Sequence, residues 1–274
     1  MKLFSRSLLS ALLFVSSVTV ASSASAQTVT TPPPAAAAPA AAAGEDARAR
    51  FATVVAARSI TNPKMLLGPF AGLDINSVAG TIGVGLRAGA SFAVMDELLV
   101  DATILPVTLS PAANYNDPTV GATYRLMNGD LEAGLRAELS LPFSGTFAMR
   151  AGGILRYHLD PTTRLDAGAL LTVATTPGRV GIQIPVSALH NFTDEIHVGA
   201  RTGFNIGDFG AASTTMAIPL GVFGAYTIKA DTGGPLLDVG PSFDFPLFLT
   251  PGGASTVNGN FFTIGLNAAF YIGL

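Results

Sequence analysis

The stretch from Thr81 to Val94, TIGVGLRAGASFAV, is apolar at every second position. Its apolar positions are Ile82, Val84, Leu86, Ala88, Ala90, Phe92 and Val94, and the residues between them are Thr, Gly, Arg, Ser or Ala. This period of two predicts an extended strand with two chemically different faces, because successive side chains of a strand point to opposite sides of a sheet. The fold therefore depends on which face meets which solvent.

The same rhythm continues to the end of the chain and predicts twelve strands. They run near residues 65–75, 80–94, 98–109, 118–127, 130–143, 146–159, 164–175, 180–189, 195–207, 214–228, 235–248 and 259–274. The first strand has two possible starts, near residue 51 or near residue 65, and Pro69 interrupts its alternation. Turn residues such as Asn128-Gly129 separate the strands and no helical pattern does, so antiparallel pairing of neighbours is expected.

Composition and strand length indicate which solvent surrounds the sheet. Charged residues make up 12% of the chain, about half the share usual in soluble domains, and hydrophobic residues 49%. Many expected strands exceed the roughly 5–6 residues typical of soluble strands and reach the roughly 9–11 that a membrane strand needs. We therefore expect an all-β fold, a transmembrane antiparallel up-and-down β-barrel, with Ile82, Leu86 and Phe92 facing lipid and Arg87 facing the lumen. A periplasmic β-protein is the alternative, and a spanning helix over 209–228 fits less well.

The last residues of the chain, GNFFTIGLNAAFYIGL, carry apolar side chains at Phe262, Ile264, Leu266, Ala268, Phe270, Ile272 and Leu274. This stretch resembles the terminal strand of Gram-negative outer-membrane β-barrel proteins, although these usually end in Phe where this chain has Leu274. The resemblance is to the class and not to one family. It implies an outer-membrane location, contact with outer-membrane lipid, and recognition of the C-terminal strand by the barrel-assembly machinery.

The N-terminal region predicts export. Lys2 and Arg6 precede an apolar run over 8–20, and Ala24-Ser25-Ala26 has the form of a signal-peptidase site, so residues 1–26 are expected to be a signal peptide. Residues 27–60, rich in Pro and Ala, are expected to form a periplasmic spacer with a possible short helix near 46–58. The barrel then occupies residues 61–274. With both of its ends in the periplasm, the longer connections 110–117, 208–213 and 249–258 lie outside the cell.

The polar residues of the inner faces are the candidate site. A two-residue turn at Asn128-Gly129 places Arg125 opposite Glu132, and the next hairpins place Glu132 beside His158 and His158 beside Asp166. We expect this row to be a stabilising set of ion pairs, with a proton-sensitive gate or a catalytic base at His158 as the alternative. The full set of expected lumen-lining residues is Arg87, Arg125, Glu132, Arg136, Glu138, Arg150, Arg156, His158, Asp166, His197, Arg201, Asp238 and Asp244.

These features favour a passive channel for small polar solutes. Twelve strands lie between the roughly eight whose interior side chains fill and the 16–18 of open porins, and a Gly-rich inner face leaves space. The lumenal charges have both signs and form no single-sign ring, so weak ion selectivity is expected. The alternative is a structural or surface-interaction barrel whose lumen is blocked by inward residues such as Arg150, Arg156, Gln183 and Phe223, or by the N-terminal segment.

Other functions are less favoured. Outer-membrane phospholipases also resemble a twelve-stranded barrel and carry Ser and His on the lipid face, whereas His158 and His197 fall on the lumenal face here. An enzyme is therefore not expected. The net charge of −3 without a basic block argues against nucleic acid as a partner. No cofactor is expected, and the three histidines have no zinc-site spacing.

Overall fold

The computed structural model describes residues 60–61, 66–78, 81–143, 147–175, 178–210, 216–229, 235–251, 256–257 and 259–273. The expected signal peptide, nearly all of the spacer and the possible helix near 46–58 lie outside these residues. Among the residues that the model describes, no helix is long and apolar enough to cross a membrane.

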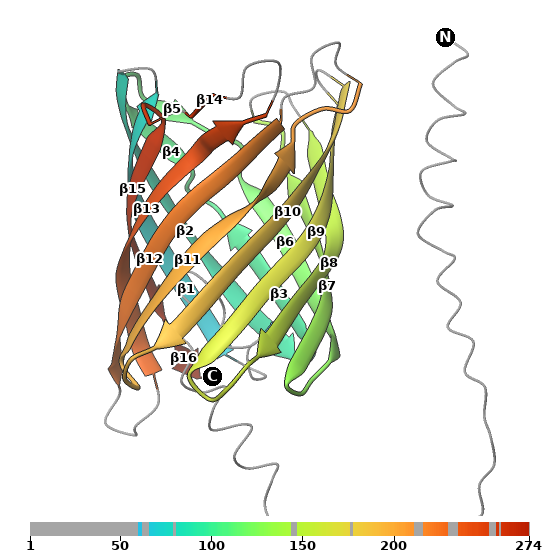
Figure 1. Cartoon of the computed structure of the whole chain (residues 1–274), viewed down its shortest axis with the longest axis vertical. Coiled ribbons are helices and arrows are strands. Elements are labelled where there is room, and N and C mark those ends of the chain that lie inside the picture. The colour runs from blue at the N-terminus through green and yellow to red at the C-terminus, as the bar shows by residue number, and fades with distance from the viewer. Residues whose placement is uncertain are drawn as a thin grey trace, which may run out of the picture. The chain divides into compact units, whose positions relative to one another are not determined.

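The described chain forms a closed antiparallel barrel of twelve strands (Figure 1). In order, these are β1 (Leu66–Val78), β2 (Thr81–Met95), β3 (Leu98–Thr103) continued by β4 (Val107–Ser110), β5 (Asn114–Tyr115) continued by β6 (Thr119–Met127), β7 (Leu131–Ser140), β8 (Ala148–His158), β9 (Thr163–Thr175), β10 (Gly178–Asn191), β11 (Ile196–Ile206), β12 (Met216–Lys229), β13 (Pro235–Thr250), and β15 (Phe262–Phe270) continued by β16 (Ile272–Gly273). The short β14 (Thr256–Val257) pairs with β13. The twelve predicted strands are thus confirmed.

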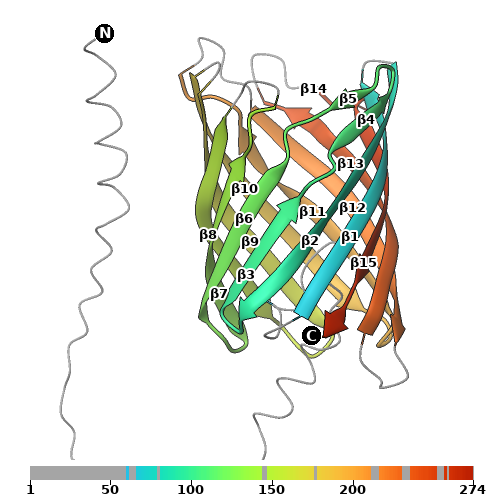
Figure 2. The same cartoon turned by 180° about the vertical axis from the view of Figure 1, so that it is seen from behind.

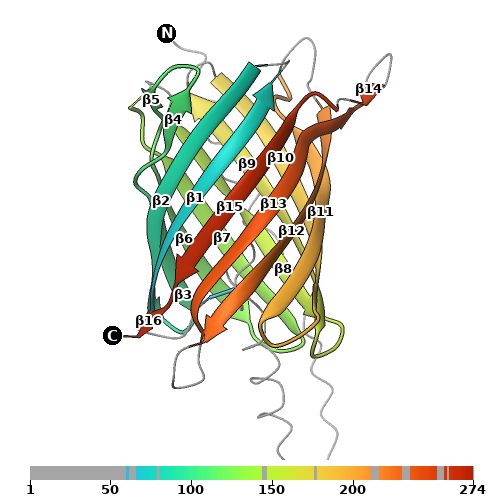
Figure 3. The same cartoon turned by 90° about the vertical axis from the view of Figure 1, so that its left-hand side faces the viewer.

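The barrel closes between its first and last strands. Phe70 of β1 pairs with Ala269 of β15, and Leu66 pairs with Gly273 of β16, while the other edge of β1 pairs with β2 (Figures 2 and 3). The first and last described strand ends therefore meet at one rim of the barrel. Closure pairs the backbone groups of the edge strands with each other, as a sheet surrounded by lipid requires.

Exposed aromatic side chains gather near both rims of the barrel. Near the rim that carries the strand termini they are Tyr124, Tyr157, Phe192, Tyr226 and Phe270, and near the other rim they are Tyr115, Phe143, Phe147 and Phe209. Phe243, in the middle of β13, is exposed between the two rims. Phe147 and Tyr157 bracket β8, and their separation of about ten residues corresponds to a height of about 25 Å for a tilted strand. This is the height of the apolar band of outer-membrane barrels.

The position of this band predicts where a charge is costly. Leu135 of β7 is 53% exposed, pairs with Gly153 and lies midway between the belts, so Leu135→Arg should destabilise the barrel by about 2–4 kcal/mol. Leu131, on the same strand, is 42% exposed and pairs with Tyr157 at belt level, so Leu131→Arg should cost at most about 1 kcal/mol. Urea unfolding in lipid vesicles measures the free energy of unfolding of both variants. Equal losses of stability in the two variants would contradict the placement of Leu135 midway between the aromatic belts and of Leu131 at belt level.

The turn between β8 and β9 is fixed by one carboxylate. Asp160 Oδ1 accepts hydrogen bonds from the hydroxyl and the backbone N–H of Thr162, both at 2.7 Å, and from the N–H of Thr163 at 2.9 Å. These bonds favour the charged form and lower the pKa of Asp160 to about 2. The contribution of Asp160 to folding is therefore complete above its usual pKa and is lost only as the pH falls through about 2.

Candidate functional site in the barrel lumen

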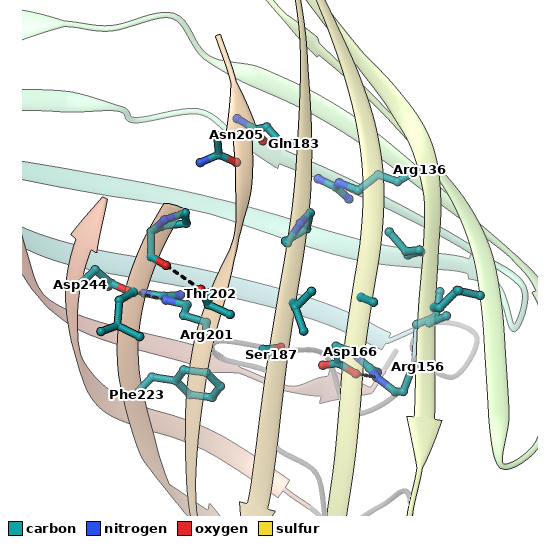
Figure 4. Close-up of a pocket in the computed structure, with 18 of the residues that line it drawn as sticks. Arg136, Arg156, Asp166, Gln183, Ser187, Arg201, Thr202, Asn205, Phe223 and Asp244 are labelled. Atoms are coloured by element: carbon teal, nitrogen blue, oxygen red, sulfur yellow. Dashed lines mark hydrogen bonds and ion pairs between the residues drawn. The ribbon is translucent and has the colours of Figure 1, made fainter. Parts of the chain in front are cut away.

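The barrel lumen contains two adjoining cavities with volumes of about 740 and 420 Å³. Residues of β6 to β13 make most of the wall of the larger cavity, and residues of β1, β2, β3 and the last strand make most of the wall of the smaller one. Arg136 and Arg201 line both cavities. These two guanidinium groups therefore lie at the boundary between the cavities, and Figure 4 shows them projecting from their strands together with several other polar side chains.

Arg136 belongs to a network of four charged residues. Its Nη1 lies 2.7 Å from Oδ2 of Asp101 and its Nη2 2.9 Å from Oδ1, so the pair is bidentate. Nη2 also lies 3.0 Å from Oε2 of Glu138, whose other oxygen is 3.3 Å from Nη1 of Arg150. Opposite charges thus alternate across the inner wall from β3 to β8, and the network holds Arg136 in one orientation.

Two further arginines are tied to partners two strands away. The guanidinium of Arg201 forms a bidentate pair with Asp244 (Figure 4). Arg87 donates from Nη2 to Oδ1 of Asn267 at 2.5 Å, and its Nε lies 3.6 Å from Oδ2 of Asp74. Both side chains therefore lie along the inner wall with their charged ends held in the lumen.

A glycine makes room for each of these long-range pairs. Gly221 pairs in register with both Arg201 and Asp244, and a Cβ there would lie 1.9 Å from Asp244 Oδ1. Gly72 stands in the same way between Arg87 and Asn267, and Gly121 lies beneath the contact of Arg136 with Asp101. The inner-face glycines were expected to leave space for solutes, but at these three positions neighbouring side chains occupy that space.

The expected row through Arg125, Glu132, His158 and Asp166 is wrong in register. Met127 pairs with Ala133, so five residues and not two connect β6 to β7, and Arg125 lies opposite Gly134. On the next pair of strands, Glu132 lies opposite Arg156 and not opposite His158. Arg156 in turn pairs with Asp166, and His158 with Arg164. Glu132 still reaches His158 diagonally, with Oε1 3.0 Å from Nε2.

The ion pairs that Asp166 forms with Arg156 and Arg164 are buried. Arg156 binds Asp166 with Nε at 2.6 Å from Oδ1 and Nη2 at 3.3 Å from Oδ2, and Nη2 of Arg164 also lies 3.3 Å from Oδ2. The side chains of Arg156 and Arg164 are 7% and 0% exposed. One carboxylate therefore serves two guanidinium groups that hardly contact solvent.

Ile60 and Thr61, which precede β1 in the chain, lie inside the barrel. Ile60 is 5% exposed and Thr61 1% exposed, and Ile60 lines the larger cavity. The backbone N–H of Ile60 donates to Oε2 of Glu132 at 2.9 Å, and the Thr61 hydroxyl donates to the carbonyl of Asp96. These contacts fix the segment Ile60–Thr61 against β7 and the β2–β3 turn, where it takes up part of the lumen.

Solved structures with a similar backbone are outer-membrane proteins. The first is an outer-membrane channel from Pseudomonas putida F1, with a TM-score of 0.56 and 11% identity over 77% of this chain and 97% of that one. This chain has the fold of an outer-membrane channel. Two more are the NanC porin, with a TM-score of 0.53 and 10% identity over 75% and 100% of the two chains, and the KdgM porin in complex with disordered oligogalacturonate, with a TM-score of 0.51 and 11% identity over 75% and 98%. No family model and no curated protein sequence matches the chain.

The remaining candidate residues of this channel-type barrel, Asp238 and His197, are buried. Asp238 is fully buried and accepts a hydrogen bond from the Tyr271 hydroxyl at 2.6 Å. His197 is 2% exposed and contacts the Phe223 ring edge-on, with 6.4 Å between ring centroids. Within the described ranges, no group of three or more His, Asp or Glu residues could hold a metal ion.

Proposed function

We propose that the protein is a passive channel for small polar solutes, with weak ion selectivity, in the outer membrane of a Gram-negative bacterium. The observation that carries this proposal is the pair of cavities inside the closed barrel, bounded by charged and neutral polar side chains. Gln183, Ser187 and Asn205 line the larger cavity beside the ion pairs, so uncharged hydrogen-bonding groups also face it. Such a lining suits solutes with several hydroxyl, amide or charged groups.

The fold and the outer surface support the same proposal. Channels and porins are among the solved structures with a similar fold, and one of these porins was solved in complex with an oligogalacturonate. The two aromatic belts fit insertion into a bilayer. In this proposal the spacer lies in the periplasm, the outer strands contact lipid, and the C-terminal strand is read by the barrel-assembly machinery. No catalytic step is assigned to the lumenal side chains.

Single-channel recording in planar lipid bilayers tests the proposal. The refolded protein lacking residues 1–26 is expected to give stepwise conductance that persists at constant voltage. Circular dichroism of the same sample, with a β-sheet spectrum, shows that the barrel is folded. Folded protein without conductance would contradict the channel and favour the alternative, a structural or surface-interaction barrel with a blocked lumen.

One observation favours that alternative. Ile60 and Thr61 fill part of the lumen, and Glu132 accepts a charge-assisted hydrogen bond from the backbone N–H of Ile60. If this segment seals the barrel, the mature protein does not conduct, whereas the protein that also lacks residues 27–61 does. Conductance of the mature protein itself would reject a sealed lumen.

A further inference from the structure

The lumenal arginines and their carboxylate partners differ in how far they reach into the lumen. Of the arginines in exposed ion pairs of the described lumen, Arg87 has a side chain 48% exposed, Arg201 39%, Arg150 35% and Arg136 25%. Their carboxylate partners are less exposed, with Asp74 at 22% and Asp101, Glu138 and Asp244 at 19%. A solute in the cavities therefore meets guanidinium groups before carboxylates.

Side-chain length and hydrogen-bond geometry explain this asymmetry. A short Asp side chain stays close to the wall, whereas the long Arg side chain carries its charge further from the backbone. The pairing of Arg201 with Asp244 uses Nε and Nη2, so Nη1 of the same guanidinium is left for another acceptor. The carboxylate, in contrast, has both oxygens engaged by the arginine. This pair thus presents its positive end to the lumen.

The arginines also occupy the position that a solute must pass. Arg136 and Arg201 line both cavities, and Arg87 lines the smaller one. A solute that crosses the described lumen through either cavity therefore passes two guanidinium groups. We propose that the lumen selects anions over cations, and that its preferred solutes are small carboxylate-bearing molecules. This inference rests on the proposed channel function and adds the sign of its selectivity.

The charges at the rim that carries the strand termini act in the opposite direction. The turns there carry Asp96, Glu97, Asp130, Asp160, Asp194 and Glu195, against the single cation Lys229 among their described residues. If these carboxylates set the selectivity, the channel would prefer cations. They lie at exposed turn tips, where salt screens a charge within about 8 Å at physiological ionic strength. The arginines act at closer range inside the cavities, so their sign is expected to prevail.

The reversal potential across a bilayer with unequal KCl concentrations on its two sides tests the proposal. The unmodified protein is expected to pass chloride over potassium by about threefold, a modest ratio because every exposed arginine has a carboxylate partner. Potassium acetate in place of KCl is expected to keep the anion preference. Arg201→Gln and Arg87→Gln should each lower the ratio, and the double variant should bring it close to one while stepwise conductance persists.

Arg179→Gln provides the matched control, because Arg179 is an exposed arginine near the start of β10, outside both cavities. This variant should keep the ratio of the unmodified protein. A ratio of one or below in a conducting, unmodified channel would overturn the anion preference and leave the channel function standing. A ratio that the Arg201 and Arg87 variants do not change would also overturn it. Absence of conductance in folded protein would instead reject the channel function itself.

Discussion

Deletion of residues 27–61 should raise the single-channel conductance of the mature barrel by about twofold or more, because conduction is limited by the narrowest part of a pore. Ile60 and Thr61 are almost fully buried within the lumen, and Ile60 lines the larger cavity. Removing them widens the passage beside Glu132. Planar-bilayer recording under identical salt and voltage measures the change.

The matched control for this deletion removes residues 27–50 alone. That variant loses most of the Pro/Ala-rich stretch but keeps Ile60 and Thr61, together with their hydrogen bonds to Glu132 and Asp96. Its conductance should equal that of the mature protein. If both deletions raise the conductance equally, the effect comes from the upstream spacer, and if neither does, the segment Ile60–Thr61 does not limit the passage.

The strands and their faces could be predicted from the sequence because they depend on local periodicity. On β7, the predicted apolar face at Leu131, Leu135 and Leu139 is 42%, 53% and 39% exposed, as an outward face requires. The polar residues between them, Glu132, Arg136 and Glu138, form the lumenal ion pairs. Alternation alone separates these two sets, since successive side chains of a strand point to opposite faces.

Register could not be predicted in the same way, because it is not a local property. Asn128-Gly129 favours a two-residue turn, but Met127 pairs with Ala133, so five residues connect the two strands. In a closed barrel each strand must fit two neighbours at once, and the sum of all staggers must allow closure. An error at one hairpin therefore shifts every expected contact between its two strands.

The contacts that shape the lumen depend on register and were missed for that reason. Arg201 meets Asp244 two strands away only because Gly221 lies between them. A glycine that faces inward between two charged residues on flanking strands is a recognisable pattern once the register is known. The contact of Ile60 with Glu132 joins residues 72 positions apart and has no periodic or motif signature in the sequence.

Asp166→Asn should destabilise the barrel more than the same change in a more exposed bidentate pair, Asp244→Asn. Asp166 is shared by Arg156 and Arg164, whose side chains are 7% and 0% exposed, so the amide leaves two buried positive charges with less compensation. Losing one partner of a buried ion pair costs about 3–5 kcal/mol. Because Glu132 lies opposite Arg156 and compensates part of its charge, we expect a loss of about 3 kcal/mol for Asp166→Asn.

Asp244→Asn changes the same chemical group in a more exposed pair. Its partner Arg201 is 39% exposed, so solvent and ions take over part of the interaction, and the loss should be at most about 1 kcal/mol. Urea unfolding of both variants in the same lipid vesicles gives the two free energies of unfolding. Similar losses would mean that water reaches Arg156 and Arg164 as readily as Arg201. A larger loss for Asp166→Asn would show that the buried ion pairs of Asp166 with Arg156 and Arg164 contribute more to the stability of the barrel than the exposed pair of Arg201 and Asp244 does.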